Sequence, residues 1–344
     1  MSLHLVVSTQ TNPYLNIAVE NYLLSLPEEE TITFYLWKNR RTVVIGQNQN
    51  PFAECNVDLL ESEGGYLMRR RTGGGAVYHD DGNLNFSFIV PHTYYDQTRQ
   101  FSVIQKAVER YGIETSVSGR NDLLCKDGEG SWRKFSGNAF NKNRYQDLHH
   151  GTILIKGNID DLQRYLLVKP AKLQKHGVAS VRSRVVNLSE LAEVTSTNIQ
   201  PYLIEAFQEV YGGKPEVWDF DMLIQKPEVK ALADEFASDE WRLGKWRSFK
   251  AQHSAQFEWG GVEVNLEIDE EHSLIKSLSL ATDSLDTNLE TLLRQHLVGA
   301  SSQHAPDLQP GLSPDESQML RDIFSLLFEL GDLHQHHNCR NDKR

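Results

Sequence analysis

Apolar residues recur at helical spacing near the start of the chain, in the segment TNPYLNIAVENYLLSL at 11–26. The positions that fall together on one helical face are Leu15, Ala18, Val19, Tyr22 and Leu23. Asn12 is a favourable N-cap, and Pro13 suits the first helical position because a proline there loses no hydrogen bond. The pattern therefore predicts a half-buried helix.

Short runs of β-branched and aromatic residues predict a series of strands in the first half of the chain. These runs lie at 31–37, 42–46, 66–70, 83–90, 114–119 and 149–156. The first two are separated only by the polar stretch KNRR, which predicts a β-hairpin. A helical pattern at 101–112 interrupts the series. Strands that follow one another directly favour a largely antiparallel or mixed sheet over a strictly alternating parallel fold.

The pattern of apolar residues changes twice in the second half of the chain. Helical patterns occur at 160–166, 188–194 and 197–213, and the last of them ends at Gly212 and Gly213. Strand patterns then follow at 255–269 and 274–284, with helical patterns at 288–299 and 319–333. A unit of this size folds independently in many proteins. We expect a boundary near 245–252, which divides the chain into domains at 1–246 and 253–344.

The totals agree with two folded domains. The chain has 344 residues, 39% hydrophobic and 24% charged, so we expect two cores and do not expect disorder as its main state. Its net charge of −12 argues against a protein that coats nucleic acid, because that function requires a basic face. A basic site in such an acidic chain is expected to bind a small anion.

Cysteine usage and the apolar runs bear on location. The three cysteines, Cys55, Cys125 and Cys339, lie far apart without CxxC spacing, which is a poor disulfide framework. The N-terminal sequence has no charged leader, and no run approaches the roughly 18 apolar residues of a membrane span. We therefore expect a cytoplasmic protein that does not insert in a membrane.

The sequence RRRTGGG at 69–75 is the first candidate for chemistry. Three glycines let backbone N–H groups approach an anion, and the arginines supply positive charge. The pattern matches neither a P-loop nor a GxGxxG dinucleotide fingerprint, and a bare GGG is also typical of a tight turn. The polar neighbours Thr72 and AVYHDDGN, between two predicted strands, favour a binding site.

A second polar set lies at 118–140, SGRNDLLCKDGEGSWRKFSGNAF. Asp122 is suited to a magnesium ion that bridges phosphate oxygens, although an Asx turn explains it equally well. Lys134 is surrounded by aromatic and small residues. Most lone lysines are solvated surface groups, but beside a carboxylate and a phosphate this one would stabilise developing charge. The pair His149 and His150 is more typical of a structural feature than of a ligand pair.

Other reactive groups give weaker signals. GxSxG is absent and no cysteine has a motif that lowers its pKa, but Cys125 lies in the second polar set, so covalent acyl transfer stays open. His79 follows the glycines closely. The tail residues His334, His336, His337 and Cys339 are the right types for a metal, but we interpret them as a solvated terminus.

Taken together, five segments resemble the two-domain bacterial lipoate-protein ligases. They are RRRTGGGAVYHDDGNLNFSF, SGRNDLLCK, RKFSGNAF, HHGTILI and VRSRVVNLSEL, and their order and spacing all agree. The similarity extends from NPYLNIAVE at 12–20 through DFDMLI into FEWGGVEVNLEID at 257–269, which is nearly the whole chain. The combination is far more specific than any one segment.

The resemblance implies an α+β fold, with a catalytic domain related to biotin-protein ligases and class II aminoacyl-tRNA synthetases and a small α+β accessory domain. It also implies two reactions. Lipoate and ATP, with Mg²⁺, give lipoyl-AMP and pyrophosphate, and a lysine of a lipoyl domain then attacks the mixed anhydride. Expected acceptors are the E2 subunits of 2-oxoacid dehydrogenases and the glycine cleavage H protein. The family favours a monomer.

The resemblance also assigns roles to individual residues. The segment expected to bind ATP and the adenylate comprises Arg71, Gly75, Ala76, Val77, Tyr78, His79, Asn121 and Asp122. Lys134 is the expected catalytic residue, in contact with both the phosphate and the lipoyl carboxyl. The residues expected near the lipoyl chain are Lys134, Ser136, Gly137 and His149. Phe86 and Phe88 are candidates for its apolar tunnel, or for plain core.

Three alternatives keep the fold but change the function. An octanoyl- or lipoyl-transferase would use a cysteine thioester, for which Cys125 is the candidate, and would not need ATP. A biotin-protein ligase is expected to carry a GRGR-type loop where this chain has RRRTGGG. A binding module without activity would be expected to lose Lys134 or the glycines. Two departures from the resemblance, Thr72 for serine and Asn138 for a smaller residue, do not alter the assignment.

Overall fold

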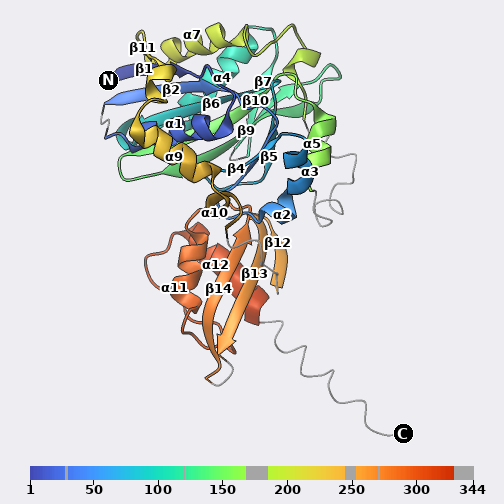
Figure 1. Cartoon of the computed structure of the whole chain (residues 1–344), viewed down its shortest axis with the longest axis vertical. Helices are drawn as coiled ribbons and strands as arrows, with labels where there is room; N and C mark the ends of the chain where they lie inside the picture. The colour runs from blue at the N-terminus through green and yellow to red at the C-terminus, as the bar shows by residue number, and fades with distance from the viewer. Residues whose placement is uncertain (28–29, 120, 168–184, 245–252, 270–271, 329–344) are drawn as a thin grey trace.

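The central sheet of the protein supports the site. The computed structural model describes residues 1–27, 30–119, 121–167, 185–244, 253–269 and 272–328. Within these residues eight strands form one sheet, in the order β11-β1-β2-β6-β10-β9-β8-β7 (Figure 1). Their bounds are β1 Ser2–Val7, β2 Thr31–Trp37, β6 Asn83–Pro91, β7 Thr115–Ser118, β8 Asp122–Lys126, β9 Trp132–Lys142, β10 Gln146–Leu154 and β11 Glu216–Trp218. β1 pairs in parallel with β2 and β11, and the other pairs are antiparallel, so the predicted mixed sheet is confirmed.

A second sheet corrects one prediction. β3 (Thr42–Ile45) pairs with β4 (Tyr66–Arg69) and β5 (Val77–His79), whereas β2 pairs with β1 and β6. The predicted hairpin between the runs at 31–37 and 42–46 is therefore wrong. The four residues between them carry the chain from one sheet to the other, and the buried Asn39 in this turn accepts a hydrogen bond from Asn16 Nδ2 at 3.0 Å. Strand patterns indicate extended segments but do not specify their partners.

Helices cover both faces of the large sheet (Figure 1). On one face α1 (Pro13–Ser25) and α9 (Pro227–Ala237) share a hydrophobic cluster. On the other face α4 (Gln97–Glu109) and α7 (Ile199–Tyr211) share another. Shorter helical segments are α2 Pro51–Glu54, α3 Val57–Ser62, η1 His92–Tyr94, α5 Ile159–Tyr165, η3 Leu188–Glu190, α8 Phe220–Leu223 and α10 Asp239–Arg242. The helix predicted at 188–194 is thus only the short η3.

Helix α1 begins as predicted but is more deeply buried. The Asn12 side chain accepts hydrogen bonds from the backbone N–H groups of Tyr14 and Leu15, which confirms the N-cap. However, the polar residues Asn16 and Glu20 are buried along with the apolar ones. The reason is that α9 packs against α1, so the helix lies between α9 and the sheet. Buried polar groups require partners, and those of α1 lead into the site.

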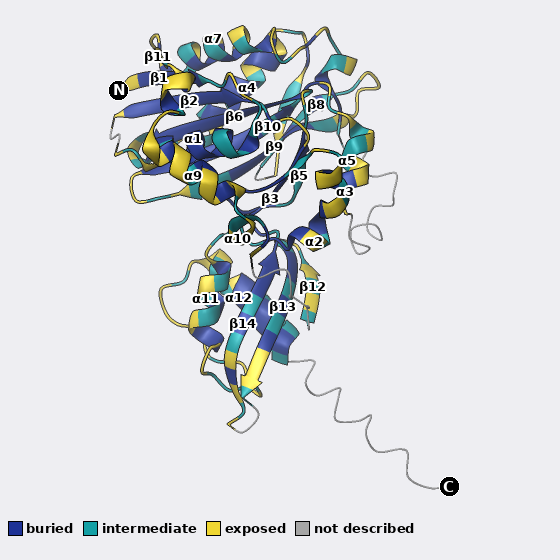
Figure 2. Cartoon of the chain, viewed as in Figure 1, coloured by how far each residue is buried: buried dark blue, intermediate teal, exposed yellow. Residues whose placement is uncertain are grey.

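The C-terminal part of the chain has its own core. β12 (His253–Phe257), β13 (Gly260–Asp269) and β14 (Leu274–Thr282) form an antiparallel sheet packed with α11 (Leu289–Leu297) and α12 (Pro314–Phe328). Figure 2 shows buried residues collected inside this unit, below the larger one. We propose the division into domains at 1–246 and 253–344 because this core uses only residues beyond 256. The boundary at 245–252 and the histidine-rich tail lie outside the described residues.

Arg69 joins the end of β4 to two other segments. Its guanidinium is 4% exposed and donates to five carbonyl oxygens. Three belong to Gly46, Gln47 and Gln49, and the others belong to Trp241 and Arg242 of α10. Arg69 is therefore a structural residue.

Within the described part of the chain, no helix combines the length and apolar character needed to cross a bilayer.

We expect Arg69→Met to destabilise the N-terminal unit by about 3 kcal/mol, because the methionine removes the hydrogen bonds that those carbonyl groups accept from the guanidinium. Urea unfolding followed by circular dichroism measures the change. Arg110→Gln is the control, because its ion pair with Glu209 lies at the surface and its loss should cost no more than about 0.5 kcal/mol. Equal effects of the two substitutions would contradict the structural role of Arg69.

Candidate functional site

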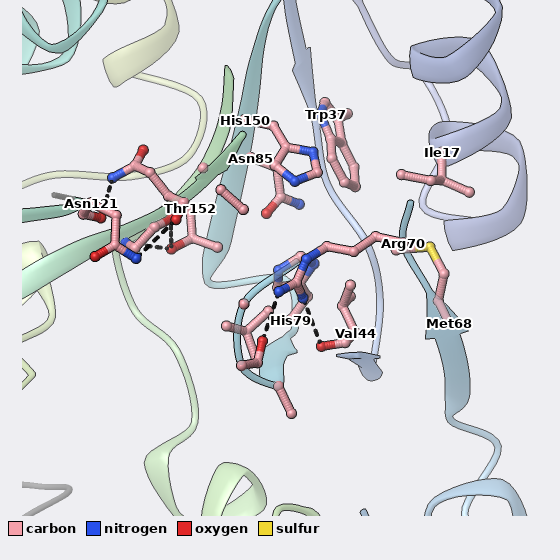
Figure 3. Close-up of a pocket in the computed structure, with 18 of the residues that line it drawn as sticks. Ile17, Trp37, Val44, Met68, Arg70, His79, Asn85, Asn121, His150 and Thr152 are labelled. Carbon is pink, nitrogen blue, oxygen red and sulfur yellow. Dashed lines mark hydrogen bonds between the residues drawn. The ribbon is translucent and has the colours of Figure 1, made fainter. Parts of the chain in front are cut away.

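A cavity opens between the two sheets of the N-terminal unit. Its volume is about 710 Å³, including the solvent space at its mouth. Its residues come from α1, β2, the small sheet, the glycine loop and the pair β9–β10. In Figure 3 the apolar side chains of Ile17, Trp37 and Met68 lie at one end, and Asn121 and Thr152 lie at the other. The cavity therefore has an apolar end and a polar end, as a site for an amphipathic ligand requires.

Arg70 holds the glycine loop, defined here as residues 72–76, against the small sheet. Its guanidinium Nη2 donates to the carbonyl oxygens of Gly73 at 2.6 Å and Gly75 at 2.9 Å. Its Nη1 reaches the carbonyl of Val44 at 3.3 Å (Figure 3). Its Nε donates to Thr72 Oγ1 at 2.9 Å. Burial lowers the pKa of Arg70 to about 10, so it stays charged at neutral pH. These bonds fix the loop from inside the protein.

The outer side of the glycine loop contacts the C-terminal unit. The backbone N–H of Gly74 donates to the carbonyl of Ser284 at 2.8 Å. Gly74 has φ 90°, in the region that favours glycine, and a Cβ at Gly73 would lie 2.4 Å from the same Ser284 oxygen. The backbone N–H of Thr282 also donates to Asn48. The glycines thus permit a close approach of the two units at the loop.

Lys134 of β9 lines the cavity at its polar end and pairs with Asp122 of β8, which does not line it. The Lys134 ammonium lies 2.7 Å from Asp122 Oδ1, and both side chains are about one-third exposed. Gly137 makes room for this lysine, since a Cβ there would lie 2.9 Å from Lys134 Nζ. Lys134, Gly137 and Asn121 all line the cavity. The structure thereby brings together residues that the sequence analysis drew from one polar set.

Asn121 and Asn138 tie β8 and β9 together beside this lysine. Asn138 Nδ2 donates to the carbonyl of Asn121, and Asn121 Nδ2 donates to the carbonyl of Asn138. Asn138 also donates to Ser136 Oγ at 3.3 Å, so Ser136 faces this network and does not line the cavity. The substitution at Asn138 noted in the sequence is therefore part of the cavity wall and of its support.

The strand alternation separates the two histidines of β10. His150 lines the cavity, whereas His149 is packed on the opposite face among Phe86, Phe88 and Phe101. His149 Nε2 and Nδ1 contact Asn138 Oδ1 and Gln100 Oε1, and burial lowers its pKa well below the usual range. Successive residues of a strand point to opposite faces, so only one of the pair can meet the ligand. Phe86 and Phe88 are core residues for the same reason.

Alternation also divides the segment after the glycines. Gly75, Ala76, Val77 and His79 line the cavity, but Tyr78 packs against Tyr165 on the far side. Burial and the neighbouring charge of Arg70 lower the pKa of His79 to about 3, so its ring is neutral. His79 Nδ1 lies 3.3 Å from Asn39 Nδ2, whereas its buried Nε2 has no hydrogen-bond partner among the described residues. The Nε2 atom of His79 can therefore form a hydrogen bond with a ligand in the cavity.

Arg71 is directed away from the cavity. It forms an ion pair with Glu235 of α9 at 2.8 Å, and its guanidinium lies 5.1 Å from the Phe236 ring centre. Arg70, the preceding residue, lines the cavity in its place. The three consecutive arginines have three different surroundings, which their sequence alone could not distinguish.

The described cysteines are unsuited to nucleophilic catalysis. Cys125 is fully buried in the core on the α4 side of the sheet, and burial raises its pKa to about 12. Cys55 is also buried, and its pKa is likewise raised to about 12. A thiol with such a pKa stays protonated at neutral pH.

The family model described as the lipoyl protein ligase A/B catalytic domain matches residues 12–208. The chain belongs to this family. A lipoate-protein ligase A from Psychrobacter cryohalolentis is 36% identical over 306 residues, covering 87% of this chain and 88% of the relative. The resemblance to lipoate-protein ligases is thus confirmed, and the match includes the cavity residues of α1, the glycine loop, β9 and β10.

Solved structures share the fold. LipL1 of P. falciparum, in complex with lipoate, is similar with a TM-score of 0.77 and 25% identity, covering 94% of this chain and 98% of that chain. A bipartite lipoate protein ligase from Thermoplasma acidophilum, described with its E2 lipoyl domain, has a TM-score of 0.59 and 26% identity. It covers 71% of this chain and 97% of that one. The predicted α+β fold is therefore confirmed.

The neutral state of buried His79 makes a pH prediction. The unfolded chain binds a proton on this histidine below about pH 6.5, but the native chain does so only near pH 3. The stability that neutral His79 contributes is present above about 6.5 and is lost as the pH falls toward 3. We expect His79→Gln to reduce this loss by up to about 1.4 kcal/mol per pH unit.

Urea unfolding at several pH values between 7 and 4 measures this slope. His272→Gln is the control for removal of an exposed histidine, because its side chain is 63% exposed. Parallel curves for wild type and His79→Gln would contradict a neutral, buried His79.

Proposed function

We propose that this cavity activates lipoate with ATP to give lipoyl-AMP, and that the chain then transfers the lipoyl group to a lysine of a lipoyl domain. The observation that supports this most strongly is the union of three features in one cavity. They are an apolar end with Trp37, a lysine at the polar end, and a glycine loop fixed by Arg70. Membership of the lipoate-protein ligase family supports the same substrate.

In the first step a lipoate carboxylate oxygen would attack the α-phosphorus of ATP. A new O–P bond forms, the bond between the α-phosphorus and the bridging oxygen breaks, and pyrophosphate leaves. Two anions must approach one another, so a nearby cation lowers the barrier. We assign this role to Lys134, whose present ion pair with Asp122 holds the ammonium at the polar end of the cavity.

In the second step the neutral ε-amine of an acceptor lysine would attack the lipoyl carbonyl carbon. An amide forms, the C–O bond to AMP breaks, and the nitrogen loses a proton. The acceptor is proposed to be a lipoyl domain, of an E2 subunit of a 2-oxoacid dehydrogenase or of the glycine cleavage H protein. The Thermoplasma acidophilum relative, whose description includes an E2 lipoyl domain, supports this class.

Magnesium is proposed as a companion of ATP. No group of three potential metal-binding side chains occurs among the described residues, so a resident metal has no cluster to hold it there. Mg²⁺ usually takes only one or two carboxylates and fills its remaining positions with phosphate oxygens and waters. Asp122 fits that limited requirement, and the ion would neutralise part of the charge of the phosphates.

The cytoplasmic location and the monomeric state remain predictions from the sequence.

We expect Lys134→Ala to lower lipoate-dependent exchange of labelled pyrophosphate into ATP by about 100-fold or more, because charge stabilisation at the reacting atoms is lost. Lys126→Ala is a matched control. This lysine lies on β8 and pairs with Glu114 at the surface. Circular dichroism establishes that both variants fold. Exchange near the wild-type rate in Lys134→Ala would contradict the catalytic assignment.

The transferase alternative makes the opposite prediction for Cys125. If the chain used a thioester, Cys125→Ala would abolish lipoylation of an acceptor domain. We expect instead that the variant retains lipoylation within about threefold of wild type, because the buried thiol is protonated and belongs to the core. Mass spectrometry of the acceptor measures the rate. A loss confined to this variant, with its melting temperature unchanged, would favour the transferase.

A further inference from the structure

Glu20 of α1 is a buried carboxylate that lies behind the cavity without lining it. It is 1% exposed, and its Oε1 is the meeting point of two hydrogen bonds. Ser87 Oγ of β6 donates to it at 2.5 Å, and His150 Nδ1 of β10 lies at 2.8 Å. A carboxylate buried in this way is costly unless other groups compensate its charge. The bonds that continue from Ser87 and His150 indicate what it holds.

Two chains of hydrogen bonds, here called arms, begin at Glu20. The first arm leads to the glycine loop. The carboxylate only accepts, so His150 Nδ1 carries the proton of that bond. The other ring nitrogen, Nε2, lies 2.9 Å from Thr72 Oγ1 and forms a hydrogen bond with it. The same Thr72 oxygen accepts from Arg70 Nε at 2.9 Å. The arm thus ends at the guanidinium that holds Gly73 and Gly75.

The other arm leads from Glu20 to the apolar end of the cavity. Trp37 Nε1 donates to Ser87 Oγ at 2.9 Å, and Ser87 in turn donates to Glu20. This fixes the plane of the Trp37 ring, which lines the cavity beside Ile17 (Figure 3). An indole N–H and a serine hydroxyl buried together need such a terminal acceptor.

Charge connects Glu20 to the loop as well. Arg70 is fully buried, and the negative charge of Glu20 raises its pKa against the lowering effect of burial. His150 and Thr72 lie between the two charges and transmit a defined hydrogen-bond geometry. Removal of the carboxylate would leave both arms without their common acceptor.

We propose that Glu20 is a positioning residue that holds the nucleotide end and the acyl end of the cavity in a fixed relation for adenylate formation. The proposal rests on the function proposed above. The carboxyl of the acyl substrate must lie in line with the α-phosphate, so a small relative shift of the two ends slows the reaction. Glu20 itself touches neither substrate in this arrangement.

The two arms can be cut separately. Thr72→Val removes the hydroxyl between His150 and Arg70, and Ser87→Ala removes the hydroxyl between Trp37 and Glu20. We expect Thr72→Val to raise the KM for ATP about tenfold and Ser87→Ala to raise the KM for lipoate by a similar factor. Each should leave the other KM within about twofold. Glu20→Gln should raise both, and Thr72→Ser should retain wild-type values because it keeps the hydroxyl.

Pyrophosphate exchange with ATP or lipoate varied in turn gives these constants, and melting temperatures report stability. Asp147→Asn is the matched control. Asp147 of β10 pairs with His92 at 2.6 Å, and neither residue lines the cavity. The substitution therefore removes a carboxylate from a histidine outside the site. It should leave both KM values unchanged.

The outcomes separate the two proposals. Absence of lipoate-dependent exchange in the wild type would refute the proposed function. With exchange present, unchanged KM values in Glu20→Gln would overturn the positioning role. If that variant does not fold, Thr72→Val and Ser87→Ala decide alone. Equal shifts of both KM values in both variants, in proportion to their loss of melting temperature, would show a merely structural network.

Discussion

The site depends on the burial of the Arg70 guanidinium beneath the glycine loop. Three glycines cannot hold one conformation by side-chain packing, because they have no side chains. Arg70 replaces that packing with bonds to the carbonyl groups of Gly73 and Gly75. A cation removed from water in this way needs compensation, which the carbonyl groups and the more distant Glu20 supply. The loop is thereby held in place by the protein alone, as the proposed binding of a phosphate there requires.

The arrangement of strands turns this loop into one wall of a cavity. The chain leaves the large sheet after β2, and β3 forms a small sheet with β4 and β5. This small sheet presents the glycine loop opposite β9 and β10. Helix α1 lies where the two sheets separate and supplies Ile17 to the cavity and Glu20 to its support. The fold therefore places the glycine loop and the apolar residues Ile17 and Trp37 in the wall of one cavity.

Local patterns predicted much of this fold. The cap at Asn12 and the strands β2, β6, β7 and β10 followed from periodicity and turn residues, whereas β1, β8, β9 and β11 of the same sheet were not predicted. Strand partners did not, because β2 and β3 are both buried throughout and carry no sign of which sheet each joins. The family match is predictable for a different reason, since it combines five segments whose order is specific.

Most of the predicted site residues line the cavity, His79 and Lys134 among them, but others miss it by one position. Arg71 and His149 have neighbours, Arg70 and His150, that face the cavity, and only the strand register decides between them. Glu20 was missed although an acidic residue in the middle of an apolar helical run is itself a signal. The central claim is that one cavity holds the acyl chain at Trp37 and the α-phosphate at the glycine loop. A crystal structure with bound lipoyl-AMP tests it most directly. We predict the dithiolane ring beside Trp37, with Lys134 in contact with the phosphate ester; an adenylate bound elsewhere, or in the reverse direction, would contradict it.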